Sequence, residues 1–208
     1  MPDPQVDEED SADATRSVAA AGSLHLAPSG PSRFPCSPAQ RGFWVLDQLD
    51  PGTPALNIAV RWQLEGAVSE VQLNSAFATL LERHAALRTS FITVDGAPVQ
   101  IVAPQLPFHI PVIDLSGLSA VNAAAEAERR AQLEARAPFD LSEPPLIRVT
   151  HLRLRENVSQ LLVTTHHLVC DDVSLTILAS ELCAICSAVQ AGRVTEMPAL
   201  PLKSGEFA

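Results

Sequence analysis

Hydrophobic and polar residues alternate along several short stretches of the chain, and this period of two predicts β-strands. The clearest stretch, residues 55–66, has an apolar side chain at every second position: Leu56, Ile58, Val60, Trp62 and Leu64. Two more β-rich runs flank Asp95-Gly96, a dipeptide that favours a tight hairpin turn. Apolar segments predict the remaining strands at residues 108–113, 146–154 and 158–169.

Capping residues indicate where the helices begin. Ser37 is a preferred N-cap and Pro38 suits the first helical position, while residues 50–52 (Asp-Pro-Gly) predict the end of that helix. Ser69 and Gln72 have the spacing of a capping box, which predicts a second helix. The same helix is predicted to carry an apolar stripe: Val71, Leu73, Phe77, Leu80 and Leu81.

Two further helices are predicted in the second half of the chain. Ser119 begins one that ends at Ala137, ahead of Pro138, and the apolar-rich segment 171–192 forms another that Gly192 ends. Strands and helices are intermixed without strict βαβ alternation, so the pattern favours an α/β fold of the mixed α+β sandwich type, with a mixed sheet flanked by helices. The absence of a glycine-rich phosphate loop disfavours nucleotide-binding folds.

Composition and charge narrow the choice of partners. The 208 residues are 47% hydrophobic, which is enough for one sizeable core. The chain has 24 acidic and 14 basic residues, so its charge does not attract nucleic acid. Its apolar stretches are interrupted short of the roughly 20 residues that span a membrane. We therefore expect no nucleic acid and no membrane partner, and a cytoplasmic location, since the N-terminus resembles no signal or transit peptide.

The N-terminal segment differs from the rest of the chain. Residues 1–16 contain six acids and one base, and the next residues are mostly alanine, serine, glycine and proline. Such a composition has too few large apolar residues to offset the entropy of ordering. We therefore predict a disordered acidic leader at residues 1–33, which is either a solvated tail or an element that docks another subunit, and one folded domain at 34–208.

Candidate chemistry is concentrated where His166 and His167 end an apolar strand and Asp171 and Asp172 begin a helix. Neighbouring strand residues point to opposite faces, so one histidine is expected to face a cavity and the other to bond within the protein. A histidine just before a helix start is favoured in its neutral form, which leaves a lone pair available as a base. Two core histidines bonded to backbone carbonyls fit the same residues.

Metal and thiol chemistry are not expected. The cysteines are too sparse for a disulfide scaffold and are predicted to be small buried thiols: Cys36, Cys170, Cys183 and Cys186. Strand geometry opposes the convergence of His166, His167 and Asp171 on a metal ion. The CxxC at residues 183–186 lies within a helix, away from the helix N-terminus that stabilises a thiolate.

Three segments, in order, resemble core motifs of nonribosomal peptide synthetase condensation domains. Residues 37–49 (SPAQRGFWVLDQL) are similar to the first motif, residues 83–91 (RHAALRTSF) to the second, and residues 166–174 (HHLVCDDVS) to the third, the HHxxxDG active-site motif. The resemblance extends from about Phe34 to Ala208. It implies a chloramphenicol-acetyltransferase-like architecture, in which two similar α/β halves form a V with a tunnel between them.

The resemblance also implies an activity. The expected reaction is amide formation between two thioesters tethered to peptidyl or acyl carrier proteins by phosphopantetheine arms, with no cofactor bound by the chain itself. His167, the second histidine of the motif, would face the tunnel as the catalytic base or as a group that orients the attacking amine, and His166 would be structural. Since a thioester is already an activated acyl donor, placing the amine and removing one proton is most of the task.

The resemblance assigns roles to further residues. Asp171 matches the family's structural aspartate, so we expect it to form a buried ion pair with Arg88 or Arg83, whose loss would cost about 3–5 kcal/mol. Asp172 replaces the glycine of the motif and, with Ser174, is a candidate tunnel-lining residue. Its carboxylate is expected to cap the following helix, or to obstruct the tunnel and raise the pKa of one of the two aspartates.

The resemblance covers only the N-terminal half of a condensation domain. We therefore expect that activity requires a C-terminal half, in the same polypeptide or as a separate chain. Two alternatives stay open: a non-catalytic half-domain that binds a carrier protein or synthetase partner, and an O- or N-acyltransferase of the same fold. The first-motif residues Ser37, Gln40 and Trp44 favour condensation over the second alternative.

Overall fold

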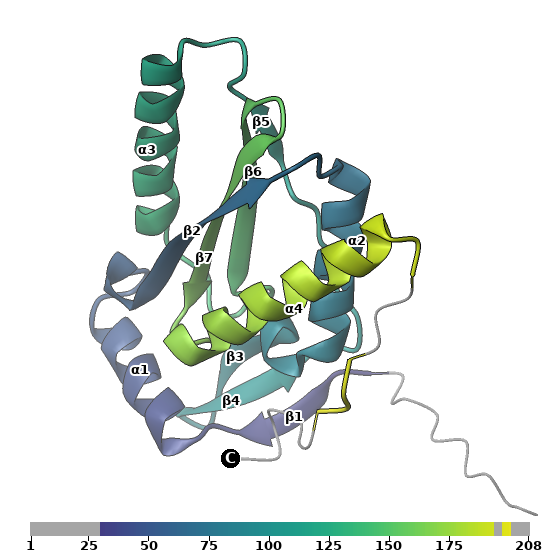
Figure 1. Cartoon of the computed structure of the whole chain (residues 1–208). Coiled ribbons are helices and arrows are strands. Elements are labelled where there is room, and N and C mark those ends of the chain that lie inside the picture. Colours follow the sequence, from purple (N-terminus) through teal and green to yellow (C-terminus); the bar gives the residue numbers. More distant parts are fainter. Residues whose placement is uncertain (1–29, 194–196, 201–208) are drawn as a thin grey trace, which may run out of the picture.

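The computed structural model describes residues 30–193 and 197–200, and within these the chain forms two β-sheets and four α-helices (Figure 1). The larger sheet has the order β2 (Asn57–Glu65), β7 (Val158–His166), β6 (Ile147–Arg155) and β5 (Val112–Asp114). The smaller sheet has the order β1 (Ser32–Pro35), β4 (Ala97–Val102) and β3 (Thr89–Val94). The predicted mixed α/β class is confirmed.

Strand pairing is antiparallel except between β5 and β6, which run parallel. The β3–β4 hairpin turns at Asp95 and Gly96, with φ angles of 50° and 78°, as the Asp-Gly dipeptide predicts. β5 is shorter than the predicted strand at 108–113 and ends one residue later. Ser32 and Arg33, assigned to the leader, pair with β4 instead, while residues 1–29 of that predicted leader lie outside the described residues.

The first three helices begin where the capping residues predict, and the fourth is capped by Asp171 rather than Asp172. The helices are α1 (Pro38–Leu49), α2 (Glu70–Arg83), α3 (Ala120–Arg136) and α4 (Asp172–Gln190). Ser37 and Ser69 each form a capping box with a glutamine three residues later. α2 ends at Arg83, and a 3₁₀ turn, Ala85–Arg88, follows it. Val71 does not belong to the apolar stripe: it is 79% exposed, whereas the other four members are buried.

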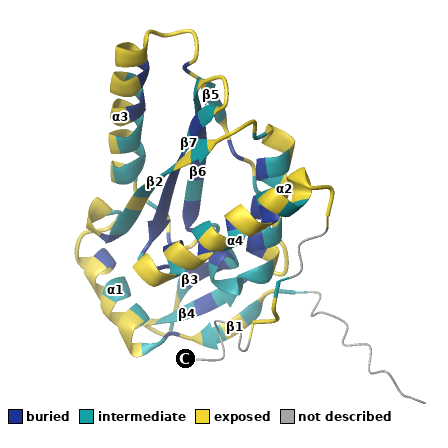
Figure 2. Ribbon diagram, viewed as in Figure 1, coloured by how far each residue is buried: buried dark blue, intermediate teal, exposed yellow. Residues whose placement is uncertain are grey.

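The larger sheet is covered on both faces (Figures 1 and 2). α2 and α4 pack on one face and form the main core with apolar residues of β6 and β7. α3 packs on the other face around Ala123 and Ala127. Figure 2 shows β6 and β7 buried between these helices, whose outer faces are exposed. The C-terminal end of β7 is therefore held firmly, and it is there that the candidate residues lie.

A smaller cluster of buried side chains lies between the two sheets, close to α1. Its buried members are Cys36, Phe91, Leu141, Leu146 and Leu168. Four half-buried residues pack against them: Phe43, Trp44, Phe139 and Val169. We call these nine residues the floor cluster. Two of them, Leu168 and Val169, directly follow His167 in the chain.

Two expectations based on apolar composition need correction. By length and composition alone, α4 is long and apolar enough to cross a membrane, with a mean hydropathy of 1.6. The sequence did not predict this, because polar residues interrupt the apolar positions of the helix. One side of the helix packs into the main core of the protein through four buried side chains: Leu175, Leu178, Leu182 and Ile185. Among the cysteines, Cys36 and Cys170 are buried as predicted, but Cys186 is only half-buried and Cys183 is exposed.

Candidate active site

His166 is the last residue of β7 and is fully buried, with 1% of its surface exposed. Its backbone N–H donates to the carbonyl of Leu146 at 3.0 Å, and its ring Nδ1 accepts the N–H of Leu168 at 3.2 Å. Burial, and to a lesser degree the neighbouring His167, lower the pKa of His166 to about 4. The ring is therefore neutral at pH 7, and its proton is on Nε2 because Nδ1 is an acceptor.

His167 lies in the turn that follows β7, and its side chain is only half-buried. Its backbone N–H donates to the carbonyl of Leu56 at 2.9 Å. Its imidazole stacks on the ring of Phe43 from α1, with centroids 4.8 Å apart and an interplanar angle of 16°. The two histidines therefore differ in exposure, but β7 ends at His166, so alternation within the strand does not account for the difference.

Gln40 of α1 connects the first motif to this turn. Its side-chain amide donates to the carbonyl of Leu168 at 3.2 Å and to Oε1 of Gln100 at 3.0 Å. The oxygen of the same amide accepts the N–H of Ser37 at 2.9 Å, which completes the capping box. Gln40 and Phe43 are three residues apart and thus share one side of α1. The first and third motifs therefore meet around His167.

Asp171 is the N-cap of α4 and is exposed. Its Oδ1 accepts the hydroxyl of Ser174 at 2.6 Å and the N–H of the same residue at 2.8 Å. These two hydrogen bonds lower the pKa of Asp171. Asp172 is the first residue of the helix and is exposed, so the capping role belongs to Asp171.

The expected ion pair between Asp171 and Arg88 is not formed. The guanidinium of Arg88 donates to the backbone carbonyls of Leu81 at 2.7 Å and Pro104 at 3.0 Å, and to that of Ala103. Arg88 thus binds a free carbonyl at the C-terminus of α2, which a cation stabilises. The carboxylate of Asp171 is exposed and accepts two hydrogen bonds from Ser174, so it is stable without an arginine partner.

Arg83, the other expected partner of Asp171, binds a different carboxylate. Its Nε lies 2.9 Å from Oε1 of Glu181 on α4, and Nε2 of His84 lies 2.6 Å from Oε2 of the same residue. Burial raises the pKa of Glu181, but hydrogen bonds from His84 and Arg83 outweigh it, so the pKa lies below its ordinary value. The second motif therefore attaches the end of α2 to α4.

Comparison with known proteins identifies the family. A family model described as "Condensation domain" matches residues 32–204, a span that includes all three motifs and the histidine turn. The chain belongs to the condensation-domain family of nonribosomal peptide synthetases. The fold likewise corresponds to that of solved condensation domains.

Synthetases from two bacteria illustrate the similarity of this condensation-domain chain in sequence. Over 175 residues it is 34% identical to one component of the linear gramicidin synthase of Brevibacillus parabrevis, an alignment that covers 84% of this chain and 3% of that protein. Over 181 residues it is 35% identical to phosphinothricin tripeptide synthetase PhsC of Streptomyces viridochromogenes, which covers 87% and 17% respectively. The chain thus spans a small part of these relatives.

Solved condensation domains share the fold at lower identity. The first condensation domain of the CDA synthetase has a TM-score of 0.75 at 22% identity, covering 81% of this chain and 43% of that structure. The starter condensation domain of the rhizomide synthetase has a TM-score of 0.74 at 22% identity, with coverages of 80% and 40%. The chain therefore spans about two fifths of each solved chain.

Ser174 lines a small cavity in this condensation domain, of about 100 Å³, near the start of α4. The cavity is enclosed mainly by apolar side chains and His84: Ala86, Leu87, Val169, Cys170, Ile177 and Leu178. Burial raises the pKa of the Cys170 thiol to about 11, so the thiol stays protonated at neutral pH. Among the described residues, no cluster of three or more histidine, cysteine and acidic side chains is arranged to hold a metal ion. The tunnel-lining roles of Ser174 and Asp172 stay predictions.

Sequence reasoning did not single out two residues of this site. Phe43, which stacks on His167, lies within the first motif, three residues after Gln40. Arg148 is a charged residue inside the apolar run of β6, and it contacts Phe139 of the floor cluster. Arg148 is the one arginine among the largely buried residues 146–152, and this is the signal that could have drawn attention to it, because a charge among buried residues requires partners.

Proposed function

We propose that this chain provides the histidine-bearing wall of a condensation enzyme. The enzyme would join a carrier-protein-bound acyl or peptidyl thioester to the amine of an aminoacyl group on a second carrier protein. The substrates would be presented on phosphopantetheine arms, and a C-terminal half would complete the tunnel. The observation that carries this proposal is the half-buried imidazole of His167, held against Phe43 at the end of a buried strand.

In the proposed reaction the amine nitrogen attacks the thioester carbonyl carbon. A C–N bond forms, the C–S bond breaks, and the pantetheine sulfur leaves as a thiolate that takes up a proton. His167 accepts the proton that the amine loses, or its ring nitrogen orients the amine by a hydrogen bond. Fixing the ring in one place supports either role, because correct placement of reacting groups accounts for much of the barrier reduction.

The proposal is tested with this chain joined to a C-terminal condensation half and supplied with two loaded carrier proteins. Mass spectrometry of the acceptor arm should detect the amide product, and His167→Ala should abolish it while the protein stays folded, with only the small loss of stability that removal of the Phe43 stack causes. His109→Ala is the matched control, because His109 is exposed in the segment between β4 and β5. Full activity of His167→Ala would contradict the proposed role.

Other results of the same assay would favour the alternatives. If the wild-type pair binds a carrier protein but forms no amide, the chain is a binding module. If product forms with a free alcohol or amine in place of the aminoacyl carrier, the chain is an acyltransferase of another specificity.

A further inference from the structure

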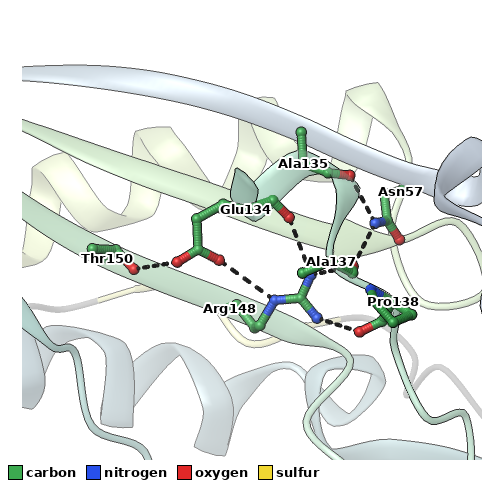
Figure 3. Close-up of polar contacts among 7 residues, drawn as sticks. All are labelled: Asn57, Glu134, Ala135, Ala137, Pro138, Arg148 and Thr150. Carbon is green, nitrogen blue, oxygen red and sulfur yellow. Dashed lines mark hydrogen bonds and ion pairs between the residues drawn. The ribbon is translucent and has the colours of Figure 1, made fainter. Parts of the chain in front are cut away.

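Arg148 fastens the C-terminus of α3 to the larger sheet (Figure 3). Its guanidinium donates to the carbonyls of Ala137 at 2.7 Å, Pro138 at 3.0 Å and Glu134 at 3.2 Å. Its Nε also lies 3.6 Å from the Glu134 carboxylate. Free carbonyls at a helix C-terminus attract a cation, and the planar fork of arginine can serve several of them at once.

A second strand contacts the same helix end. The side-chain amide of Asn57, on β2, donates to the carbonyls of Ala135 and Ala137, each at 2.9 Å (Figure 3). β2 and β6 are the two neighbours of β7, and Asn57 lies directly opposite His166 in the β2–β7 pairing. Both strands that flank the histidine-bearing strand are therefore tied to the end of α3.

Arg148 also holds an aromatic ring of the floor cluster. Its guanidinium carbon lies 3.7 Å from the centroid of the Phe139 ring, a cation–π contact. Phe139 in turn makes an edge-to-face contact with the imidazole of His166, with centroids 6.1 Å apart and an interplanar angle of 79°. Arg148 thus reaches His166 through a single intervening side chain.

His166 transmits this placement to the turn. Its Nδ1 accepts the N–H of Leu168, the residue on the far side of His167. Leu168 is itself buried in the floor cluster beside Phe139. The backbone of His167 is therefore fixed on both sides, by the ring of His166 before it and by Leu168 after it.

From this chain of contacts we propose that Arg148 is a positioning residue for His167, acting through Phe139 and the ring of His166. Only the kinetic consequence of this positioning role depends on the proposed function. The physical arrangement can be tested on the chain alone. The alternative is that Arg148 simply stabilises the end of α3.

The first test is NMR of the histidine side chains in the full 208-residue chain, labelled with nitrogen-15. Arg148→Met keeps the apolar stem and removes the charge and the hydrogen-bond fork. We expect the imidazole signals of both His166 and His167 to shift, and the pKa of His166 to rise from about 4 towards its ordinary value as water reaches the ring.

Arg61→Met is the matched control for the loss of an arginine. Arg61 also joins the sheet to α3, through a pair with Glu128 at 2.6 Å, but it is exposed and lies outside the floor cluster. This variant should leave both imidazole signals in place. If Arg148→Met leaves them in place as well, Arg148 only stabilises α3 and the inference is wrong.

A second pair of variants keeps the test decisive if Arg148→Met does not fold. Phe139→Leu removes the ring that faces both Arg148 and His166, whereas Phe139→Tyr keeps it. We expect Phe139→Leu to shift both imidazole signals and Phe139→Tyr to leave them close to their wild-type positions. Identical imidazole signals in Phe139→Leu and the wild type would overturn the inference.

Kinetics of the completed enzyme provide the final readout. A misplaced His167 should lower kcat by about tenfold or more while leaving KM unchanged, because the base and not the substrate site is displaced. If the wild-type enzyme forms no amide but the imidazole signals move as expected, the proposed function fails and the positioning role stands. If kcat falls without any imidazole shift, the positioning role fails.

Discussion

The imidazole of His167 lies flat against the ring of Phe43, with centroids 4.8 Å apart. Phe43 comes from α1, near the start of the folded domain, whereas His167 follows the last strand, so the stack joins two distant parts of the sequence. Its geometry fixes the plane of the imidazole and leaves the ring half-exposed. The position of α1 therefore determines where the proposed catalytic group points.

Phe43→Leu tests the catalytic weight of this stack. The substitution keeps a half-buried apolar side chain and removes the aromatic face, so we expect a loss of about 1 kcal/mol in the free energy of unfolding. In the completed enzyme we expect kcat to fall by about tenfold. Phe43→Tyr, which keeps the ring, should stay within about twofold of the wild-type kcat. An unchanged kcat in a folded Phe43→Leu enzyme would show that the stack does not matter for catalysis.

Burial of neutral His166 predicts a pH dependence of stability. The pKa is 6.5 for an ordinary histidine and about 4 in the folded chain, so the unfolded state binds the proton more readily. The contribution of neutral His166 to the free energy of unfolding is fully present above pH 6.5. It is lost as the pH decreases towards 4, by up to about 3 kcal/mol. His166→Gln should lose less over this range in urea unfolding experiments at each pH. Parallel curves for the two proteins would contradict the burial effect.

The N-cap of α4 predicts different outcomes for two adjacent aspartates. Asp171→Ala removes the acceptor of both Ser174 hydrogen bonds and should lower the free energy of unfolding by about 1 kcal/mol. Asp172→Asn is the control, since Asp172 does not cap the helix, and it should cost less than about 0.5 kcal/mol. Chemical denaturation measures both. Equal losses would show that Asp171 is not the cap.

The pKa of Asp171 is lowered in the folded chain, which determines how this capping contribution varies with pH. It is present above the pKa of the unfolded state, which is about 3.9, and is lost as the pH falls through the lower folded pKa. The difference in stability between the wild type and Asp171→Ala should therefore shrink below about pH 4.

Glu181 is predicted to be a main link between α2 and α4. Glu181→Gln removes the charge that faces both Arg83 and His84, so it should lower the free energy of unfolding by about 2 kcal/mol. Glu128→Gln is the control, because its pair with Arg61 is about half-exposed and is expected to contribute less than about 1 kcal/mol. Similar losses in the two variants would mean that the half-buried position of Glu181 does not strengthen its interactions with Arg83 and His84.

Local signals in the sequence predicted much of the fold. Ser37 and Ser69 begin helices because their capping boxes involve residues only three positions apart, and Asp95-Gly96 turns a hairpin on its own backbone preference. Such features need no knowledge of distant segments. β1 was missed because it is only four residues long and ends in Pro35, so it is too short to show a period of two and has the composition of a loop.

The candidate site was predictable only in part. The resemblance to the third motif led to His167 and His166, but the alternation argument does not apply to the pair, because His167 lies in the turn beyond the end of β7. The ion pair of Asp171 with an arginine was wrong, because nearby acceptors bind Arg88 and Arg83 while Ser174 satisfies Asp171. Ser174 is only three residues from Asp171, whereas Glu181 is 98 residues from Arg83, so local and distant partners both compete with the predicted pair, and only a structure shows which of them prevails.

One side chain makes the N-terminus of α1 inseparable from the histidine turn. The amide of Gln40 bonds to Ser37, Gln100 and the carbonyl of Leu168, so it belongs at once to a helix cap, a strand and the turn. Helix ends ordinarily fray on their own, with rapid exchange of their amide hydrogens for deuterium. In this chain the first turn of α1 cannot open without releasing Leu168, so both segments should exchange through a single shared opening event.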